Sequence, residues 1–329
     1  MKFFRYLAVK LVNFFLLEAN FFYDYIAFKK WVSKASKPKK ERKELEGWIL
    51  QDKHRLEKGF TLPVPRLQFG REVMERLAGN LLHYKTRFGE DIIYFIGIGA
   101  IAAYERYHVE RKSLPDFLTQ IKKRFAPEDF LDPRCSLAGY DLKLSRPTKN
   151  FDSLNFAELT RIRRSCRSYD KVKSAGITSD ILRNIVEMAI TAPSVCNRQH
   201  WHVHFFKGDD VGRVLKYQNG SSGFNDRVPF LALITSDLRA FYTDDERNQS
   251  YTDGGLFAMN LIYAIQSMGL ESCPLNWCNS FVSEIKFRRL GLIPPSEIVV
   301  MALAFGVAAD SAIYAKSPRL PVESFYSIH

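Results

Sequence analysis

The sequence lacks several features that mark secreted, zinc-binding or membrane-spanning proteins. Its five cysteines form no C-x-x-C pair, and no second pair or nearby histidine completes a zinc set around Cys273 and Cys278. Free thiols in a reducing cytosol are therefore expected. There is also no Walker loop, no dinucleotide G-x-G-x-x-G and no Ser-His-Asp arrangement, so the sequence gives no support for those chemistries.

Acidic residues are too few to balance the basic ones in the first part of the chain. The 329 residues, of which 46% are hydrophobic, can bury a sizeable core and allow about two domains. The formal net charge is +12, but residues 1–150 account for +11 of it and residues 151–329 for only +1. This asymmetry predicts an anionic partner for the N-terminal part, either nucleic acid or anionic lipid.

Residues 1–33 favour lipid, and no nucleic-acid partner is expected. Apolar residues recur there at helical spacing, but charged residues interrupt them too often for a spanning helix, and no small-residue cleavage site follows. Six of the ten residues 34–43 are basic, which is typical of an interfacial helix on an anionic membrane surface. The alternative is a helix whose aromatic face packs on protein in a dimer, and the pattern slightly favours it. We expect a cytoplasmic protein, peripheral at the inner face of the membrane in the first case.

Two polar clusters lie about 30 residues apart in the C-terminal part. Arg163, Arg164, Ser165 and Arg167 form the first, where planar guanidinium groups make a compact site for a phosphate. The second, residues 192–201, carries short polar side chains and a proline just after a helix-periodic segment. Such a segment can present amide and N–H groups to a flat heterocycle. Together the clusters predict a site for a phosphorylated aromatic cofactor.

These clusters resemble the R-R-S-x-R and A-P-S-x-x-N-x-Q-P-W segments of the FMN-dependent nitroreductase family. His200 stands where the family usually has proline. Residues 251–270 resemble the long central helix of that family, closed by Gly269 as a C-cap glycine would close it. Residues 316–321 resemble its basic tail, although two residues separate Lys316 from Arg319 where many relatives have one. The resemblance covers most of residues 151–319.

The resemblance implies an α+β fold, with a nitroreductase-like central sheet flanked by helices. It also implies a homodimer in which both chains build each of two FMN sites. Arg163, Ser165 and Arg319, with Lys316 beside them, would hold the phosphate, and Arg167 would lie at the N1–O2 edge of the ring. The cofactor-binding residues it implies are Arg163, Arg164, Ser165, Arg167, Pro193, Ser194, Asn197, Gln199, Pro274, Leu275, Asn276, Lys316 and Arg319.

Within that set, Pro193, Ser194, Asn197 and Gln199 would come from the partner subunit, and the backbone of residues 274–276 would face N5. No catalytic side chain and no metal ligand is identified. The implied activity takes electrons from NADH or NADPH through FMN to an acceptor that the sequence does not identify. Two alternatives stay open: an FMN-dependent dehydrogenase or tailoring enzyme, and a non-enzymatic membrane-surface protein with a vestigial flavin site. Because every recognised motif follows residue 151, the flavin site is expected to form without residues 1–150.

The periodicity predicts a mostly helical region over residues 1–150 and alternating helices and strands over residues 151–310. Residues 71–125 read as two or three helices, with 92–103 buried, and residues 132–147 as a linker. A helix capped by Ser179 or Asp180 should run to residue 191. Strands are expected at residues 201–206, 229–235 and 298–305.

Two further groups of polar residues carry weaker predictions. Residues 52–59 are similar to H-R-x-E-K-G segments that precede some nitroreductase-like domains, but no chemistry follows from them, and a solvated helix end capped by Gly59 is the simpler interpretation. His200, His202 and His204 would share one face of a strand. A polar strand face is favoured there over a metal site, because no carboxylate or cysteine lies at suitable spacing.

Overall fold

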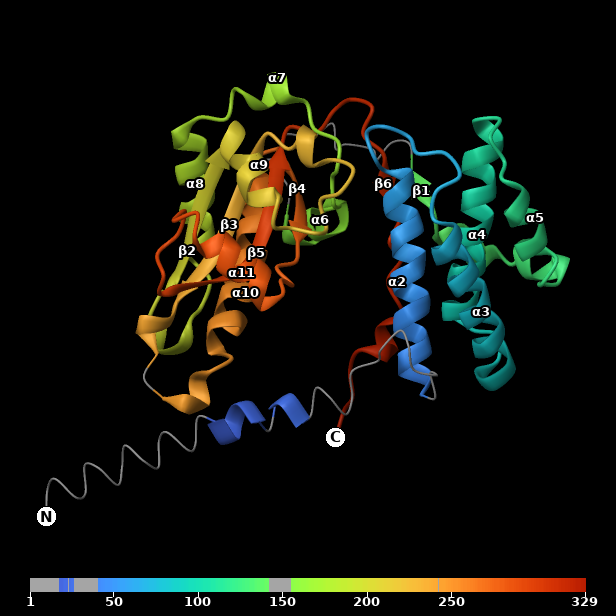
Figure 1. Cartoon of the computed structure of the whole chain (residues 1–329), viewed down its shortest axis with the longest axis horizontal. Helices are drawn as coiled ribbons and strands as arrows, with labels where there is room; N and C mark the ends of the chain where they lie inside the picture. The colour runs from blue at the N-terminus through green and yellow to red at the C-terminus, as the bar shows by residue number, and fades with distance from the viewer. Residues whose placement is uncertain (1–17, 23, 27–40, 142–154, 242) are drawn as a thin grey trace, which may run out of the picture.

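A computed structural model describes residues 18–22, 24–26, 41–141, 155–241 and 243–329. Within these ranges the chain forms a helical part before residue 142 and a sheet part after residue 154, standing side by side (Figure 1). Residues 34–40 of the predicted basic run and most of the predicted helix at residues 1–33 lie outside the described residues, while Arg42 and Lys43 open the first described long helix.

Four helices build the helical part. They are α2 (Arg42–Phe60), α3 (Arg71–Phe88), α4 (Ile92–Glu110) and α5 (Asp116–Lys122). α4 is apolar on almost every side, which suits a helix surrounded by protein, and it packs against α2, α3 and the short turns η1 (Pro127–Leu131) and η2 (Pro133–Leu137). Gly99 lets α4 approach η2 closely, since a Cβ there would lie 2.1 Å from the carbonyl oxygen of Cys135.

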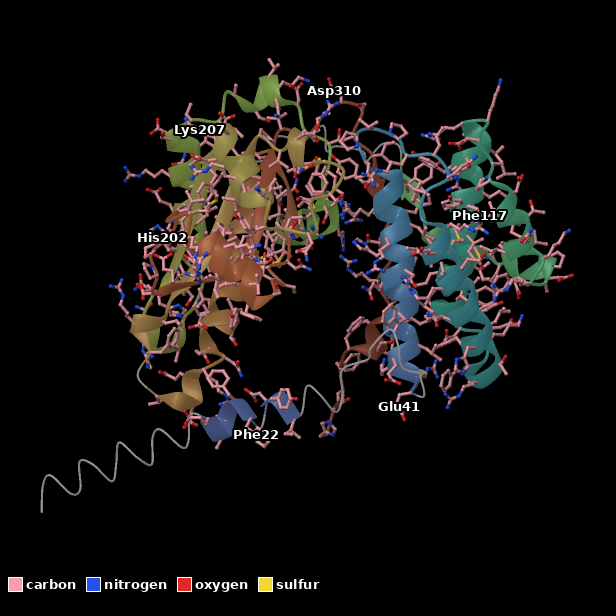
Figure 2. All side chains as sticks on the ribbon, in the orientation of Figure 1. Phe22, Glu41, Phe117, His202, Lys207 and Asp310 are labelled. Atoms are coloured by element: carbon pink, nitrogen blue, oxygen red, sulfur yellow. The ribbon has the colours of Figure 1, made fainter. Side chains whose placement is uncertain are left out.

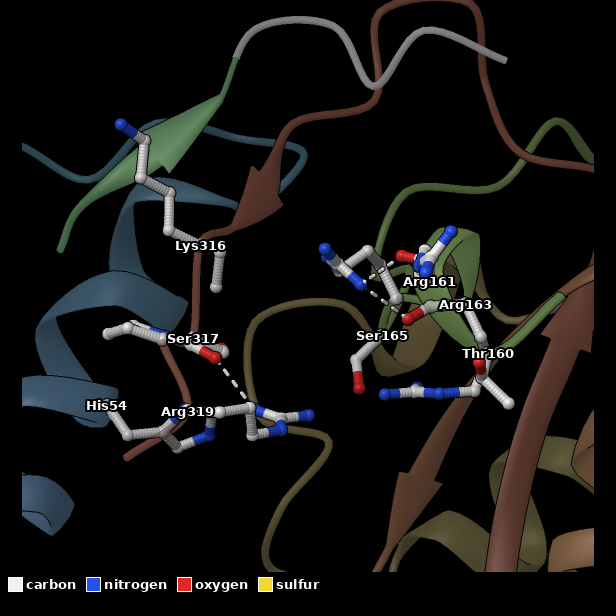
Figure 3. Close-up of a pocket in the computed structure, with 11 residues that line it drawn as sticks. His54, Thr160, Arg161, Arg163, Ser165, Lys316, Ser317 and Arg319 are labelled. Carbon is white, nitrogen blue, oxygen red and sulfur yellow. Dashed lines mark hydrogen bonds between the residues drawn. The ribbon is translucent and has the colours of Figure 1, made fainter. Parts of the chain in front are cut away.

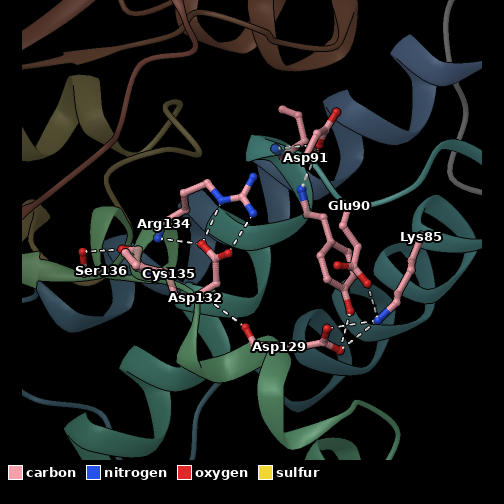
Figure 4. Close-up of polar contacts among 11 residues, drawn as sticks. Lys85, Glu90, Asp91, Asp129, Asp132, Arg134, Cys135 and Ser136 are labelled. Carbon is pink, nitrogen blue, oxygen red and sulfur yellow. Dashed lines mark hydrogen bonds and ion pairs between the residues drawn. The ribbon is translucent and has the colours of Figure 1, made fainter.

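Polar contacts fix η1 against these helices (Figure 4). The Asp129 carboxylate accepts hydrogen bonds from Lys85 Nζ at 3.0 Å and from the Tyr94 hydroxyl at 2.8 Å. Asp91 begins α4 by accepting from the backbone N–H of Ile93 at 2.9 Å. The helical part is therefore a compact scaffold with its own core.

The sheet part has a four-stranded antiparallel sheet in the order β2-β3-β5-β4. The strands are β2 (Trp201–Lys207), β3 (Phe230–Asp237), β4 (Glu271–Leu275) and β5 (Glu297–Gly306). Its helices are α6 (Phe156–Ile162), α7 (Lys171–Ser174), α8 (Ser179–Ala189), α9 (Asp209–Leu215), α10 (Gln249–Ser267) and α11 (Phe281–Arg288). α8 and α10 bury their apolar faces on one side of the sheet, while α9 and α11 contribute to the core on the other. The expected α+β fold is confirmed.

Segments of each part pack against the other part. The short strand β1 (Tyr140–Asp141) follows the helical part and pairs with β6 (Tyr314–Ala315), which follows the sheet (Figure 1). Ile313 and Leu320 pack on the core of the helical part, and Leu62 packs in the core of the sheet part. The chain after β5 is thus held first by the core of the sheet part, which includes Ala308, Ala312 and Tyr314, and then by the helical part.

The predicted elements agree with the structure except at their ends. The strands at 201–206, 229–235 and 298–305 and the helices within residues 71–125 are confirmed, as is Gly269, which follows α10 with a φ of +73°. Thr178, and not Ser179 or Asp180, caps α8. The linker prediction is wrong for residues 132–141, because Cys135, Ala138 and Tyr140 are buried in the helical core.

Residues 18–22 and 24–26 are helical and lie beside the sheet part, where Figure 2 labels Phe22. Asp24 accepts hydrogen bonds from Arg247 Nε at 2.8 Å and Nη2 at 3.1 Å, just before α10. Phe21, Phe22 and Tyr25 are each more than half exposed. No helix in the described ranges has both the length and the apolar character that crossing a bilayer requires. Both predictions for the aromatic face of this helix, contact with an anionic membrane and packing on protein in a dimer, stay predictions.

Candidate functional site

A cavity of about 540 Å³ lies between the sheet part and the helical part (Figure 3). Its volume is within the range of about 300–1,000 Å³ that small-molecule and cofactor sites occupy. One wall comes from the end of α6 and the segment after it, and the opposite wall from α2 and the C-terminal tail (Figure 3). The lining residues are His54, Thr160, Arg161, Arg163, Arg164, Ser165, Ala315, Lys316, Ser317, Pro318 and Arg319.

The first wall is held by the edge of the sheet. Asn155 caps α6 by accepting from the N–H of Glu158 at 3.0 Å, and the helix ends at Arg163. The chain then runs along β4, where Ser165 forms a parallel bridge with Ser272 and the Cys166 N–H donates to the Ser272 carbonyl at 3.0 Å. This pairing buries the Cys166 side chain in the core, while Arg163 and Ser165 line the cavity.

The second wall is the basic tail. The backbone N–H of Lys316 donates to the Gly139 carbonyl at 3.1 Å, and its Nζ donates to the Ser136 carbonyl at 2.9 Å. Arg319 Nη1 donates to the carbonyl of Ser317 at 2.6 Å. Both basic residues of the tail line the same cavity as Arg163, so the two-residue spacing between them does not remove either from it.

Positive charge dominates the cavity. Five of its described lining residues are lysine or arginine, and none is acidic. Burial lowers the pKa of the Arg163 guanidinium, and the neighbouring charges of Arg319 and Arg164 lower it further. Cations held this close repel one another, so an anion bound among them would relieve the repulsion. The Nη1 of Arg164 already donates to two backbone carbonyls, those of Arg161 at 2.7 Å and Arg163 at 3.0 Å, whereas Lys316 and Arg319 each donate to one.

Arg167 lies next to this group and is only 5% exposed. Its Nη1 is buried and has no hydrogen-bond partner among the described residues. A buried guanidinium nitrogen without an acceptor is costly, and natural structures keep such groups where a ligand completes the hydrogen bond. The arginine cluster, Ser165 and this unpaired donor fit a phosphorylated cofactor whose ring offers acceptor atoms.

His54 is the lining residue that comes from the helical part, since α2 carries it (Figure 3). Its side chain is solvent-exposed and faces the cavity between the two parts. Burial, followed by the positive charges of Arg167, Lys53 and Lys58, lowers the pKa of His54 to about 4. The cavity that contains the predicted phosphate residues is therefore lined from the helical part as well, and the formation of the flavin site without residues 1–150 stays a prediction. The H-R-x-E-K-G segment was the available signal for His54.

The second sequence cluster lies elsewhere in the same chain. Pro193, Ser194, Asn197 and Gln199 precede β2, at the opposite edge of the sheet from β4, and none of them lines the cavity. Three strand spacings of about 4.8 Å put the two edges roughly 14 Å apart. Cys196, Asn197 and Gln199 all have φ near +50°, so this turn has an unusual backbone that its hydrogen bonds must hold.

His200 explains part of that turn. Its Nε2 contacts Asp253 Oδ2 and its Nδ1 contacts Ser236 Oγ, each at 2.8 Å, and the same Asp253 oxygen accepts from the Val195 N–H at 2.8 Å. Burial acts to raise the pKa of Asp253, but hydrogen bonds from His200, Val195 and Gln249 outweigh it and lower the pKa. The histidine at the usual proline position is thus part of a buried network that braces the turn.

The backbone of Pro274, Leu275 and Asn276 forms and follows the end of β4 and does not line the cavity either. The carbonyl of Asn276 accepts from Gln218 Nε2 at 2.8 Å. Among the described residues, no group of histidine, cysteine and carboxylate side chains is arranged to hold a metal, and His202 lies on the outer strand β2 (Figure 2). All five cysteines are free, as expected.

Comparison with known proteins places the sheet part in a family. The model of the Nitroreductase family matches residues 160–219 and 208–307. The CLA biosynthesis enone reductase of Lactiplantibacillus plantarum is 30% identical over 214 residues, which are 52% of this chain and 94% of that enzyme. A Bacillus subtilis (strain 168) protein assigned as an NAD(P)H nitroreductase is 22% identical over 202 residues, covering 51% of this chain and 96% of its own.

A solved structure is similar over the same share of the chain. It is that of a Desulfovibrio desulfuricans protein assigned as a nitroreductase, in complex with FMN; it is 20% identical, has a TM-score of 0.45, and the match covers 54% of this chain and 98% of that one. The family match together with the near-complete coverage of a relative at 30% identity identifies the family, so this chain belongs to the Nitroreductase family.

Proposed function

We propose that the protein binds FMN in the cavity between its two parts and transfers electrons from NADH or NADPH to a small-molecule acceptor. The observation that carries this proposal is the set of cations around one cavity, next to the unpaired Nη1 of the buried Arg167. When bound, FMN supplies the hydride and electron chemistry. The protein's own residues bind and orient it, and no side chain is assigned as a catalytic acid.

In this proposal Arg163, Ser165 and Arg319 hold the phosphate, with Lys316 beside them. Guanidinium forks and a hydroxyl donor suit phosphate oxygens. Arg167 donates to the ring edge where negative charge develops, which stabilises the reduced cofactor. Arg164 contributes mainly charge, because backbone carbonyls already accept its hydrogen bonds.

We also propose that the site is shared in a homodimer. The turn that carries Asn197 and Gln199 leads into the β2 edge, whereas residues 163–167 lie along the β4 edge. Because this turn lies at the far edge of the sheet from the cavity of its own chain, we assign its contact with the flavin to a second copy of the chain. The geometry therefore supports a pocket to which the second copy contributes its residues 193–199.

The acceptor is proposed to be an electron-poor conjugated molecule. Two relatives of this chain are an enone reductase and a 4-nitrobenzoate reductase. An enone and a nitroarene share an electron-deficient π-system that can take a hydride or electrons from a reduced flavin.

Reconstitution tests the proposal. Purified full-length protein is incubated with FMN, desalted, and assayed for released flavin per chain; NADH and NADPH are then added without oxygen while the flavin absorbance is followed. We expect close to one FMN per chain and bleaching by at least one nicotinamide, with recovery of the colour when an enone or nitroarene is added. Protein that retains no flavin after reconstitution refutes the proposal.

A further inference from the structure

The structure gives the residues of the H-R-x-E-K-G segment on α2 specific partners. Gly59 does not cap the helix, because α2 continues to Phe60, and Gly59 is buried against the Phe69 ring, where a Cβ would lie 2.1 Å from Cε2. The interpretation of residues 52–59 as a solvated helix end is therefore wrong. His54 and Lys58 are four residues apart and project from one face of α2 toward the sheet part, while Lys53 and Glu57 occupy the adjacent face.

We propose that His54 is a cofactor-binding residue, which the helical part contributes to the phosphate end of the flavin pocket. This inference rests on the proposed binding of FMN. His54 lines the cavity opposite Arg163 and Ser165, beside Arg319 (Figure 3). Among the described residues its ring nitrogens have no hydrogen-bond partner, so they are available to a ligand in the cavity.

The chemistry of a neutral imidazole suits this position. The crowded cations around the cavity disfavour another positive charge, and the lowered pKa of His54 keeps the ring neutral at physiological pH. A neutral ring still offers one N–H, which can donate to a phosphate oxygen without adding to the repulsion. A lysine or arginine at this position would add repulsion whenever the cavity is empty.

Glu57 shows why α2 is fixed relative to the basic tail. It is fully buried; its Oε2 accepts from Lys53 Nζ at 2.7 Å and its Oε1 accepts from the Gly139 N–H at 3.0 Å. The Gly139 carbonyl in turn accepts from the Lys316 N–H at 3.1 Å. Gly139 therefore links α2 to the tail, so that His54 and Arg319 share a single rigid wall.

Lys58 fixes the same helix to the sheet part. Its Nζ donates to the carbonyl of Gly220. The Gly220 N–H donates to Gln218 Oε1 at 2.6 Å, and Gln218 Nε2 donates to the Asn276 carbonyl. α2 is thus attached both to the basic tail and to the sheet part, and these contacts fix the part of the helix that carries His54.

The test compares FMN with riboflavin, which lacks the phosphate. Each flavin is titrated into flavin-free full-length wild-type protein, His54→Ala and the control His83→Ala, an exposed histidine on α3, with quenching of flavin fluorescence as the readout. Loss of one hydrogen bond to a charged phosphate should weaken FMN binding by His54→Ala about tenfold or more. Riboflavin binding should be unchanged, and His83→Ala should match the wild type for both flavins.

The outcomes separate this inference from the proposal beneath it. If His54→Ala binds FMN as the wild type does, or loses affinity for both flavins equally, His54 does not contact the phosphate and the inference is overturned. Wild-type protein that binds FMN in either of those experiments leaves the proposed function standing. Wild-type protein that binds neither flavin refutes the proposed function itself.

Discussion

Replacing Arg167 by methionine should change the empty and the FMN-bound protein in opposite directions. The guanidinium is 5% exposed, its Nη1 has no partner among the described residues, and Lys58 and His54 both lie within its electrostatic reach. An unsatisfied buried polar group costs about 1–3 kcal/mol. Methionine keeps most of the volume and removes that cost. Flavin-free Arg167→Met should therefore have a free energy of unfolding about 1–3 kcal/mol above that of flavin-free wild type, and so a higher melting temperature.

The bound state should respond in the other direction. A hydrogen bond to a charged group contributes about 1.5–3 kcal/mol, which corresponds to a roughly 10- to 150-fold weaker FMN affinity in Arg167→Met. Thermal unfolding without flavin and fluorescence titration with FMN measure the two effects. Arg183→Met is the control, since Arg183 is exposed on α8 and its ion pair among the described residues is with Glu187 in the same helix. A variant that is destabilised without flavin and yet binds FMN normally would contradict the role assigned to Arg167.

Three further predictions concern the helical part and the N-terminus. The pKa of His54 is lowered from 6.5 to about 4 by burial and nearby cations, so between these pH values the unfolded chain binds a proton that the folded protein does not. The stability of the flavin-free protein should therefore fall as the pH falls through this window. His54→Gln should flatten this part of a plot of melting temperature against pH, and an unchanged plot would count against the assignment. Gly139→Ala should lower the free energy of unfolding by about 1–3 kcal/mol and weaken FMN binding, because φ is +110° and the new Cβ would lie 2.9 Å from Ala103 Cβ. The control Gly79→Ala, whose new Cβ meets nothing within 4 Å, should change neither the melting temperature nor the FMN affinity. Full-length protein should sediment with phosphatidylserine vesicles at low salt, and protein lacking residues 1–43 should not, since each basic residue near an anionic surface contributes about 1 kcal/mol of binding free energy. Equal sedimentation of both proteins would favour packing of the aromatic face on protein.

The sequence determined the family and the local structure of the sheet part. Patterns of residues that are close in the chain sufficed for this: strand segments rich in apolar and β-branched residues, a helix closed by Gly269, and the arginines at 163–167. These features depend on steric and hydrogen-bonding preferences over a few residues, so they can be read without knowing the rest of the fold. The ends of elements were less certain, as Thr178 shows, because a cap is chosen by the hydrogen bond that forms.

Only the tertiary structure decided which residues meet across the cavity. His54 and Arg319 are far apart in sequence, and their meeting depends on the pairing of β1 with β6 and on a buried contact between Glu57 and Gly139. No local pattern encodes such a contact, since a Glu four residues from a Lys is equally typical of an exposed helix face. The same sequence spacing that reads as a solvated helix end becomes a wall of a binding site once the C-terminal tail folds back onto α2. That return of the tail is a property of the packed core as a whole, in which Ile313 and Leu320 are partly buried against the helices.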